Sequence, residues 1–559
     1  MTLSSDEGAI PGALLVLPLG VLLIMLTRDP APWSEPFFWI LYLAIVSIGI
    51  FASFRSTGDG LLTLIIVAII LHLIVPTRQP EAFTWDGTSA HEMQVTRLAM
   101  ENGALVIGAG NTTASQFSYF PGVQMIFVAL TTVTGLSLEV VIKFLAPLLN
   151  PLVLLSIYMF ATRTLESSRM RKTAVIAAVL VYVACPRFEF KDAFTVYESI
   201  AIVMLPLILA TWGRGAKRTF LSALMLIALV ISHNFTSYVL LVFAVALAMS
   251  QRILARQRAL VPSAGSLAIV SMVLVALWSF YVATTRSEVL LNFGIALERV
   301  LFFGMTNQGV DVAPTIYSLR EIDLVLSVIG VCSLSLFLLA GTVLSFKERR
   351  GNLVAFAFVA GMIMLTLYAL IPWRSFALIE SGDMKTRGIE FGYLGLAGAA
   401  GLGIAGFLRR ARRPRVKLLA LVLLLLIFFP TIFVGFPQFY YRYTPPLKTG
   451  PQVMPMEKFN SGLWISDHYA SPSGAIYATS LGTYYSGYFE LESCGDAIET
   501  ITTRTGFDSC QVVALDLVNF NVPDSLGRTL RIEDLAWLES RSNRIYSSST
   551  IAVFIIWAG

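Results

Sequence analysis

A group of ionisable residues stands directly after an apolar run of the chain. The segment EAFTWDGTSAHEMQVTRLAMENG, which begins at Glu81, follows the run LLTLIIVAIILHLIVPT and contains Asp86, His91, Glu92 and Arg97. A carboxylate such as Asp86 could bind a divalent cation, act as a general base, or be a solvated loop residue. The imidazole of His91 and the guanidinium group of Arg97 could bind an anionic substrate.

The spacing within this segment predicts a helix just after Asp86. Ser89 and Glu92 match the Ser-x-x-Glu capping box, in which the two side chains satisfy backbone N–H groups at a helix N-terminus. The predicted helix runs from Ser89 to Asn102 and Gly103. Asp86 would then lie just ahead of this helix, at the membrane surface.

A second acidic group follows another apolar run. The segment CPRFEFKDAFTVYES supplies Glu189, Asp192 and Glu198 in a short loop between two predicted spans. Acids this close to hydrocarbon are costly and usually mark a functional site. Carboxylates from two outer loops are what a Mg²⁺- or Mn²⁺-dependent transferase needs to hold a lipid-linked phosphate and to activate an acceptor. We therefore expect Asp86 and Glu198 to be catalytic, and both of them, with Asp192, to be candidate metal ligands.

The composition places these acids in a membrane protein. Hydrophobic residues make up 56% of the 559 residues and charged residues only 13%, so an ordinary globule could not bury the apolar surface. The net charge of +5 resides in short basic clusters between apolar runs, a pattern that marks membrane topology and argues against a nucleic-acid partner. The N-terminal apolar segment lacks a basic region before it and a cleavage site after it, so we interpret it as a retained helix.

Thirteen membrane spans follow from placing the basic clusters on the cytoplasmic side, with the N-terminus inside and the C-terminus outside the plasma membrane. The predicted spans are 9–27, 36–54, 60–77, 139–162, 173–186, 199–213, 219–233, 236–250, 265–284, 322–345, 353–371, 388–408 and 418–436. The run FPGVQMIFVALTTVTG from Phe120 would reverse this order if it crossed, so it is predicted to be a half-embedded helix at the outer face. It belongs to the long outer loop 78–138, and the predicted membrane domain is 1–436.

The remaining residues, 437–559, form a predicted extracytoplasmic α/β domain. Its apolar runs are short enough for strands and are separated by polar segments. Cys494 and Cys510 could form a disulfide on the oxidising side of the membrane, or remain two free or buried thiols. Cys185 and Cys332 fall inside predicted helices and are interpreted as packing residues.

The first outer loop resembles that of the GT-C glycosyltransferases, a superfamily that includes the bacterial and archaeal oligosaccharyltransferases. The resemblance consists of the Asp-Gly pair in WDGTSAHEMQVTRLAMENG, an Arg downstream in the following helix, the surface helix led by YFPGVQ, and the acids of FKDAFTVYES. It covers about Pro80 to Ser250. It implies an inverting transferase that moves a sugar or glycan from a polyprenyl- or dolichyl-phosphate-linked donor to a protein or glycolipid acceptor, with membrane lipids around it. The tail lacks the WWDYG motif of the oligosaccharyltransferases, which puts recognition of a peptide acceptor in doubt.

Other outer-face groups fit this interpretation. Arg374, Lys385 and Arg387 would stand at one helix mouth, where cations could clamp a phosphate or form an interfacial belt. His233 falls at a tight outer turn, as a substrate contact or as a satisfied interfacial histidine. Glu139 and Lys143 begin a span and are interpreted as interfacial.

Two other functions stay open. An inactive scaffold or subunit could keep the GT-C architecture. A transporter would carry ionisable groups near mid-bilayer, whereas the predicted spans hold few charges at their centres.

Overall fold

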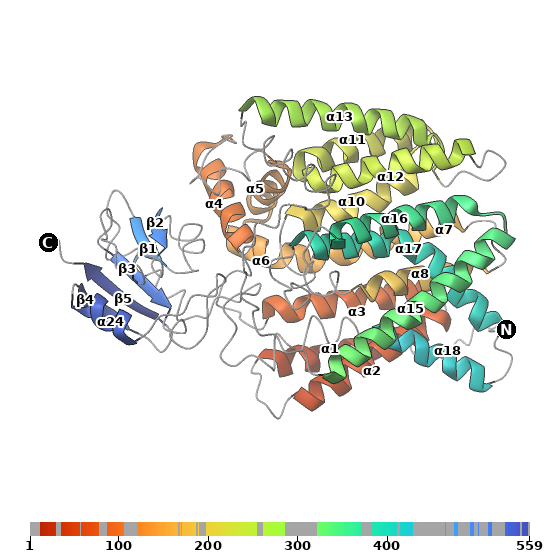
Figure 1. Ribbon diagram of the computed structural model, residues 1–559, viewed down its shortest axis with the longest axis horizontal. Coiled ribbons are helices and arrows are strands. Elements are labelled where there is room, and N and C mark those ends of the chain that lie inside the picture. The colour runs from red at the N-terminus through yellow and green to blue at the C-terminus, as the bar shows by residue number, and fades with distance from the viewer. Residues whose placement is uncertain are drawn as a thin grey trace.

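The computed structural model is a bundle of helices with a small sheet near the C-terminus (Figure 1). It describes residues 12–28, 35–55, 57–77, 87–104, 120–165, 168, 170–185, 188, 197–253, 261–285, 321–369, 383–410, 414–428, 464–465, 475–478, 492–496, 501, 512–516, 532–540, 542–547 and 551–556. Some side chains at the ends of these segments are not described. The predicted domain boundary at 436 and most of the predicted outer loop 285–321 lie outside these residues.

The helices follow the apolar runs of the sequence. The first group is α1 (Gly12–Arg28), α2 (Glu35–Arg55), α3 (Thr57–Thr77), α4 (Gly87–Asn102), α5 (Gly122–Thr134), α6 (Leu138–Leu149), the short 3₁₀ turn Asn150–Leu152, α7 (Val153–Thr164) and α8 (Arg171–Val183). The second is α10 (Tyr197–Thr211), α11 (Ala216–Ser232), α12 (Asn234–Ile253), α13 (Ala264–Thr285), α15 (Glu321–Lys347), α16 (Gly351–Ala369), α17 (Asp383–Arg410) and α18 (Pro414–Leu426).

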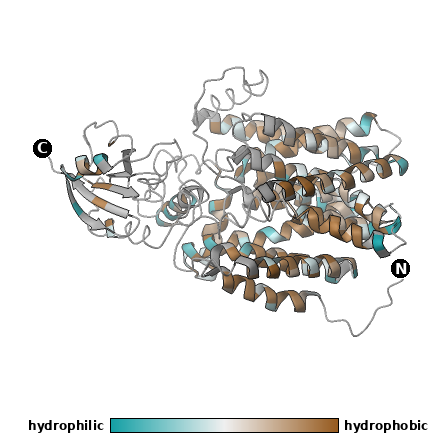
Figure 2. Cartoon of the chain, turned by 60° about the horizontal axis from the view of Figure 1, so that its bottom comes forward, coloured by the Kyte–Doolittle hydropathy of each residue, from teal (hydrophilic) through white to brown (hydrophobic). Residues whose placement is uncertain are grey.

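A described helix overlaps each predicted span, α6 and α7 together forming the one predicted at 139–162. Within the described part of the chain, six helices are long and apolar enough to cross a bilayer. Large apolar side chains on the outside of the bundle face where lipid would be: Leu277 and Phe280 of α13 are 63% and 71% exposed. Figure 2 shows hydrophobic residues along the helices and hydrophilic ones mainly at their ends. The chain is therefore a polytopic helical membrane protein.

Helix α17 is the centre of the bundle, and its glycines let neighbouring helices approach closely. It packs against α8, α15 and α16. A Cβ on Gly403 would collide with the carbonyl oxygen of Phe337, and one on Gly401 would lie only 2.6 Å from the backbone nitrogen of Ala178. Because apolar surface gains little from helix contact in lipid, such close backbone packing is the main source of association.

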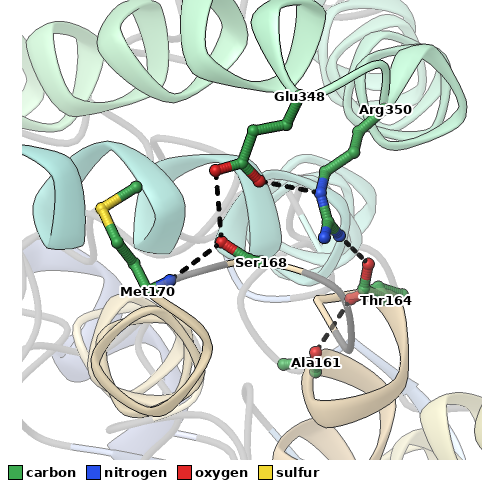
Figure 3. A network of polar contacts seen from close by, with 6 residues as sticks. All are labelled: Ala161, Thr164, Ser168, Met170, Glu348 and Arg350. Atoms are coloured by element: carbon green, nitrogen blue, oxygen red, sulfur yellow. Dashed lines mark hydrogen bonds and ion pairs between the residues drawn. The ribbon is translucent and has the colours of Figure 1, made fainter.

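One turn at the end of the bundle is held by charge (Figure 3). Arg350, just before α16, donates from its guanidinium group to the carbonyl oxygen of Thr164 at 2.6 Å and pairs with Glu348 at 3.0 Å. Glu348 also accepts a long hydrogen bond from Ser168 at 3.5 Å. The guanidinium group thus caps the C-terminus of α7 and ties it to the α15–α16 turn.

The C-terminal sheet has five strands in the order β2-β1-β3-β5-β4. The strands are β1 (Ala475–Ala478), β2 (Glu492–Asp496), β3 (Val512–Asp516), β4 (Ser542–Ser547) and β5 (Ile551–Ile556), with helix α24 (Ile532–Glu539) before β4. Strand β1 pairs in parallel with β2 and β3, whereas β5 pairs antiparallel with β3 and β4. Figures 1 and 2 both place this mixed sheet beyond one end of the helix bundle, which we name the sheet-side end.

The glycine packing of α17 generates a stability prediction. Gly403→Ala should destabilise the protein by about 1–3 kcal/mol, because the added methyl group has no space against the backbone of α15. The measurement is the thermal midpoint of the detergent-solubilised protein. Gly361→Ala on α16 is the control, since a Cβ there meets nothing within 4 Å. Equal midpoints for the two variants would contradict close packing at α17.

Candidate functional site

Within the described helix bundle, from α1 to α18, the buried carboxylate, ammonium and imidazole side chains lie at the sheet-side end. They are His72 on α3, Glu92 on α4, Lys143 on α6, His233 between α11 and α12, and Glu390 on α17, each at most 4% exposed. His72 lies one turn and a half before the end of α3, and Lys143 and Glu390 lie in the first two turns of their helices. Buried ionisable groups are expensive in a membrane protein and are retained where they serve a site.

Helix α4 lies across the sheet-side end of the bundle (Figure 1) and is tied to α5 by a buried polar contact. The side-chain nitrogen of Gln124 donates a hydrogen bond to the carboxylate of Glu92. Two residues before Gln124, the glycine at 122 lies so close to Ser232 that a Cβ would collide with the serine hydroxyl. Helix α5 therefore joins α4 to the end of α11.

A second connection joins α3, α8 and α17. His72 Nε2 lies 2.8 Å from the carbonyl oxygen of Phe188, a residue that follows α8, and the two rings are 4.8 Å apart. The ring of Phe188 is also 5.2 Å from Tyr182. The hydroxyl of Tyr182 donates to the carboxylate of Glu390 at 2.9 Å. The start of the α8–α10 connection is thus anchored on two sides.

The turn between α11 and α12 meets the same region. Nδ1 of His233 lies 2.6 Å from the hydroxyl of Thr236, and its ring is 6.4 Å from that of Phe235. Phe235 is 5.9 Å from Phe391, the neighbour of Glu390 on α17. The contact with Thr236 occupies one ring nitrogen of His233, and the role of this histidine stays a prediction.

The predicted site residues divide into three groups. Asp86, Asp192, Arg374 and Cys510 lie outside the described residues. His91, Glu198, Lys385, Arg387 and Cys494 belong to described helices or strands, but their side chains are not described. Arg97 and His233 are described in full. His91 is close to the buried Glu92 in the sequence, and Lys385 and Arg387 are close to the buried Glu390. The roles of all the predicted site residues stay predictions.

Arg97 makes an ion pair in the structure. One of its terminal nitrogens lies 3.5 Å from the carboxylate of Glu139 at the start of α6, and the two side chains are 30% and 41% exposed. This exposure leaves Arg97 reachable from water, and the pair fixes the orientation of α4 over α6.

The structure adds detail to three expectations from the sequence. Helix α4 begins at Gly87, two residues before the predicted start at Ser89, and the carboxylate of Glu92 accepts a hydrogen bond from Gln124. Lys143, which the sequence places at the interface, is only 4% exposed, and its helix α6 packs against α3 and α4. Helix α17 begins at Asp383, before the predicted span 388–408, so Lys385 and Arg387 lie in its first turns.

Sequence reasoning missed His72, Tyr182 and Glu390. A signal was present for two of them, since His72 and Glu390 are polar residues inside otherwise apolar runs. Nothing in the sequence shows that they come together, because they belong to helices far apart in the chain.

The candidate cation site cannot be assembled from the described side chains. Among the residues that the structure describes, no group of three His, Cys, Asp or Glu is close enough to hold a metal ion. A divalent cation at Asp86, Asp192 and Glu198 is therefore kept as a proposal.

Neither a family model nor a curated protein matches the sequence. Among solved structures, apo ArnT from Cupriavidus metallidurans superposes with a TM-score of 0.50 at 12% identity, over 89% of this chain and 98% of ArnT. Arabinofuranosyltransferase AftD from Mycobacteria gives 0.50 at 13% identity, over 89% of this chain and 40% of AftD. The oligosaccharyltransferase AglB from Archaeoglobus fulgidus, in complex with an inhibitory peptide and a dolichol-phosphate, gives a TM-score of 0.48 at 11% identity. The superposition covers 82% of this chain and 69% of AglB. The chain therefore shares its overall fold with ArnT and AftD, in agreement with the expected resemblance.

The contact of His72 generates a prediction of stability. His72→Leu leaves the buried carbonyl of Phe188 without this partner and should cost about 1–3 kcal/mol. Glu139→Gln, which breaks the half-exposed pair with Arg97, should cost at most about 1 kcal/mol. Thermal unfolding of the solubilised variants measures both. If Glu139→Gln lost more stability than His72→Leu, the buried contact of His72 would not be the stronger of the two.

Proposed function

We propose that the chain is a membrane glycosyltransferase that moves a sugar or glycan from a polyprenyl- or dolichyl-phosphate-linked donor to an acceptor at the extracytoplasmic face. The observation that carries this proposal is the gathering of buried ionisable groups at the sheet-side end of the bundle. The fold shared with AftD, an arabinofuranosyltransferase, supports it.

The position of the ionisable groups favours transfer at a surface over transport through the membrane. A transporter binds its substrate near the bilayer midplane, where broken helices expose backbone groups. In the described helices, the buried charged side chains stand within about two turns of helix ends or on the crossing helix α4. Such a site suits a substrate whose headgroup lies at the interface while its lipid tail stays in hydrocarbon.

Asp86 and Glu198 carry the chemistry in this proposal. One carboxylate takes the proton of the acceptor as the acceptor attacks the sugar, and the bond from the sugar to the phosphate oxygen breaks. Asp86 directly precedes α4 and Glu198 is the second residue of α10, so both belong to the edges of the region described above. With Asp192 they are the proposed ligands of Mg²⁺ or Mn²⁺, which would neutralise phosphate charge when bound.

The leaving group is an anionic polyprenyl phosphate, so cations must stand near it. The proposed cations are those of α4 and α17, namely Arg97, Lys385 and Arg387, with His91, His233 and Arg374 as further candidates. An Arg is suited to this role because its planar guanidinium group can bind two phosphate oxygens at once. Arg97 is the described member of the first group, and its partial exposure leaves it accessible to a substrate.

The proposed arrangement in the membrane has thirteen spans, a cytoplasmic N-terminus and an extracytoplasmic domain at 437–559, all in the plasma membrane. It is supported by the described helices at the predicted spans and by the separation of charge: exposed cations such as Lys172, Lys217 and Arg410 lie at turns opposite to those that carry the acids. The sheet would then stand outside the cell, over the end that holds the proposed site (Figure 1).

Neutralising either proposed catalytic carboxylate should abolish function. Asp86→Asn and Glu198→Gln keep side-chain volume and remove charge, so transfer should fall by about two to four orders of magnitude while the protein still inserts. The measurement is the polyprenyl-linked sugar pool of cells in which each variant replaces the protein. We expect the donor glycolipid to accumulate as it does when the protein is absent.

The matched control is Glu101→Gln, an exposed acid on the same helix, α4. It should leave the glycolipid pool as in the unaltered protein. If all three variants behave alike, the acids near Asp86 are solvated loop residues and the transferase proposal is lost. An unchanged pool in the absence of the protein would favour a scaffold instead.

The topology has its own test. In a chain whose four native cysteines are replaced by alanine, Ser540→Cys should react with a membrane-impermeant maleimide in intact cells. Lys217→Cys, in the exposed first turn of α11, should react only after permeabilisation. Labelling of both positions from outside would contradict the proposed orientation.

A further inference from the structure

A buried pair of polar side chains joins α17 to α8 at the sheet-side end. Tyr182 and Glu390 are both 0% exposed, and the tyrosine hydroxyl donates to the carboxylate at 2.9 Å. Helices α8 and α17 pack against each other, and their backbones approach closely at Gly401, farther along α17. The pair therefore acts as a fixed point between two helices that already touch through their backbones.

The same tyrosine contacts the connection that leaves α8. Its ring is 5.2 Å from that of Phe188, whose carbonyl oxygen is held by His72 of α3 at 2.8 Å. Phe188 stands in the segment that contains the second acidic group, ten residues before Glu198. A single chain of contacts thus runs from α3 through the start of this connection to α17.

Glu390 also determines how the first turns of α17 are set. Arg387 precedes Glu390 by three residues, so the two positions share one face of the helix, with Arg387 one turn nearer its N-terminus. Any rotation of α17 that moves Glu390 away from Tyr182 would carry position 387 with it. The contact with Tyr182 therefore fixes the rotation of α17 about its axis and the position of its N-terminal turns along that axis.

Packing alone does not require this pair. A carboxylate and a phenol hydroxyl inside a membrane protein could be replaced by apolar groups of similar size, and such exchanges of both partners are often neutral for stability. A buried carboxylate is by contrast costly to place between membrane helices. The presence of the pair is therefore better explained by the relative orientation of α8 and α17 that it imposes than by a gain in stability.

We propose that Glu390 and Tyr182 are positioning residues, which together hold Arg387 at the mouth of α17 in the place where it binds the phosphate of a polyprenyl carrier. This inference rests on the proposed function and deepens it. Neither residue touches the substrate, since both side chains are fully buried. They affect substrate binding only by fixing the orientation of α17 against α8.

The test uses undecaprenyl phosphate as the probe, bound to the full-length protein in lipid nanodiscs, with dolichyl phosphate run in parallel. The variants are Arg387→Ala, the double variant Tyr182→Phe with Glu390→Met, and the triple variant that combines them. We expect Arg387→Ala and the double variant each to weaken binding by about tenfold. The triple variant should bind about as weakly as either, because both changes remove the same interaction.

Two controls separate positioning from stability. Tyr238→Phe removes another interhelical hydroxyl contact, 2.8 Å from Ser279, and should leave probe binding unchanged. Glu390→Gln in an otherwise unaltered chain keeps an oxygen that can accept from Tyr182, and it should bind the probe nearly as tightly as the unaltered protein. The thermal midpoint of each variant is measured alongside, and the double variant should fall no further than Tyr238→Phe.

The outcomes are distinct. If the unaltered protein binds neither probe, the proposed donor class fails. If it binds and Arg387→Ala weakens binding while the double variant does not, the positioning inference alone is overturned. Additive losses in the triple variant, or no effect of Arg387→Ala, overturn it as well, because Glu390 would then not act through Arg387.

Discussion

The close approach of α17 to its neighbours is the interaction on which the rest of the structure depends. In lipid, apolar side chains gain little by leaving one apolar environment for another, so helices associate where their backbones can touch. Helix α17 meets this condition on several sides, with Gly395 against Ala360 of α16, Gly401 against α8 and Gly403 against α15. One helix thereby sets the positions of three others.

The buried polar contacts at the sheet-side end depend on this packing. Tyr182 can reach Glu390 only because α8 and α17 run side by side along the length that separates Gly401 from Glu390. The resulting contact then extends to Phe188 and His72, and so to α3. Close packing supplies the frame, and hydrogen bonds between buried groups select one arrangement within it.

The two ends of the bundle use charge differently. At the end shown in Figure 3, Arg350 and Glu348 satisfy each other and the end of α7, at a turn where water is near. At the sheet-side end, Glu92 and Glu390 are buried and accept hydrogen bonds from neutral groups, Gln124 and Tyr182. The first arrangement stabilises a turn, whereas the second keeps acidic groups inside the protein beside the segments that carry the proposed site.

The sequence by itself determined the membrane class and the positions of the helices. Long apolar runs can be satisfied in a bilayer only as helices, so 60–77 and 265–284 agree closely with α3 and α13. The end of α4 was also predictable, because a glycine at position 103 is typical of a helix C-terminus. The structure gives Gly103 a φ of 63°, a conformation that favours glycine. The tertiary structure decided which helices touch, and therefore that Lys143 is covered, that Glu92 meets Gln124, and that Tyr182 meets Glu390. These contacts join residues up to 208 positions apart. Hydropathy is a local property of the chain, whereas a contact between distant helices depends on how all of them pack.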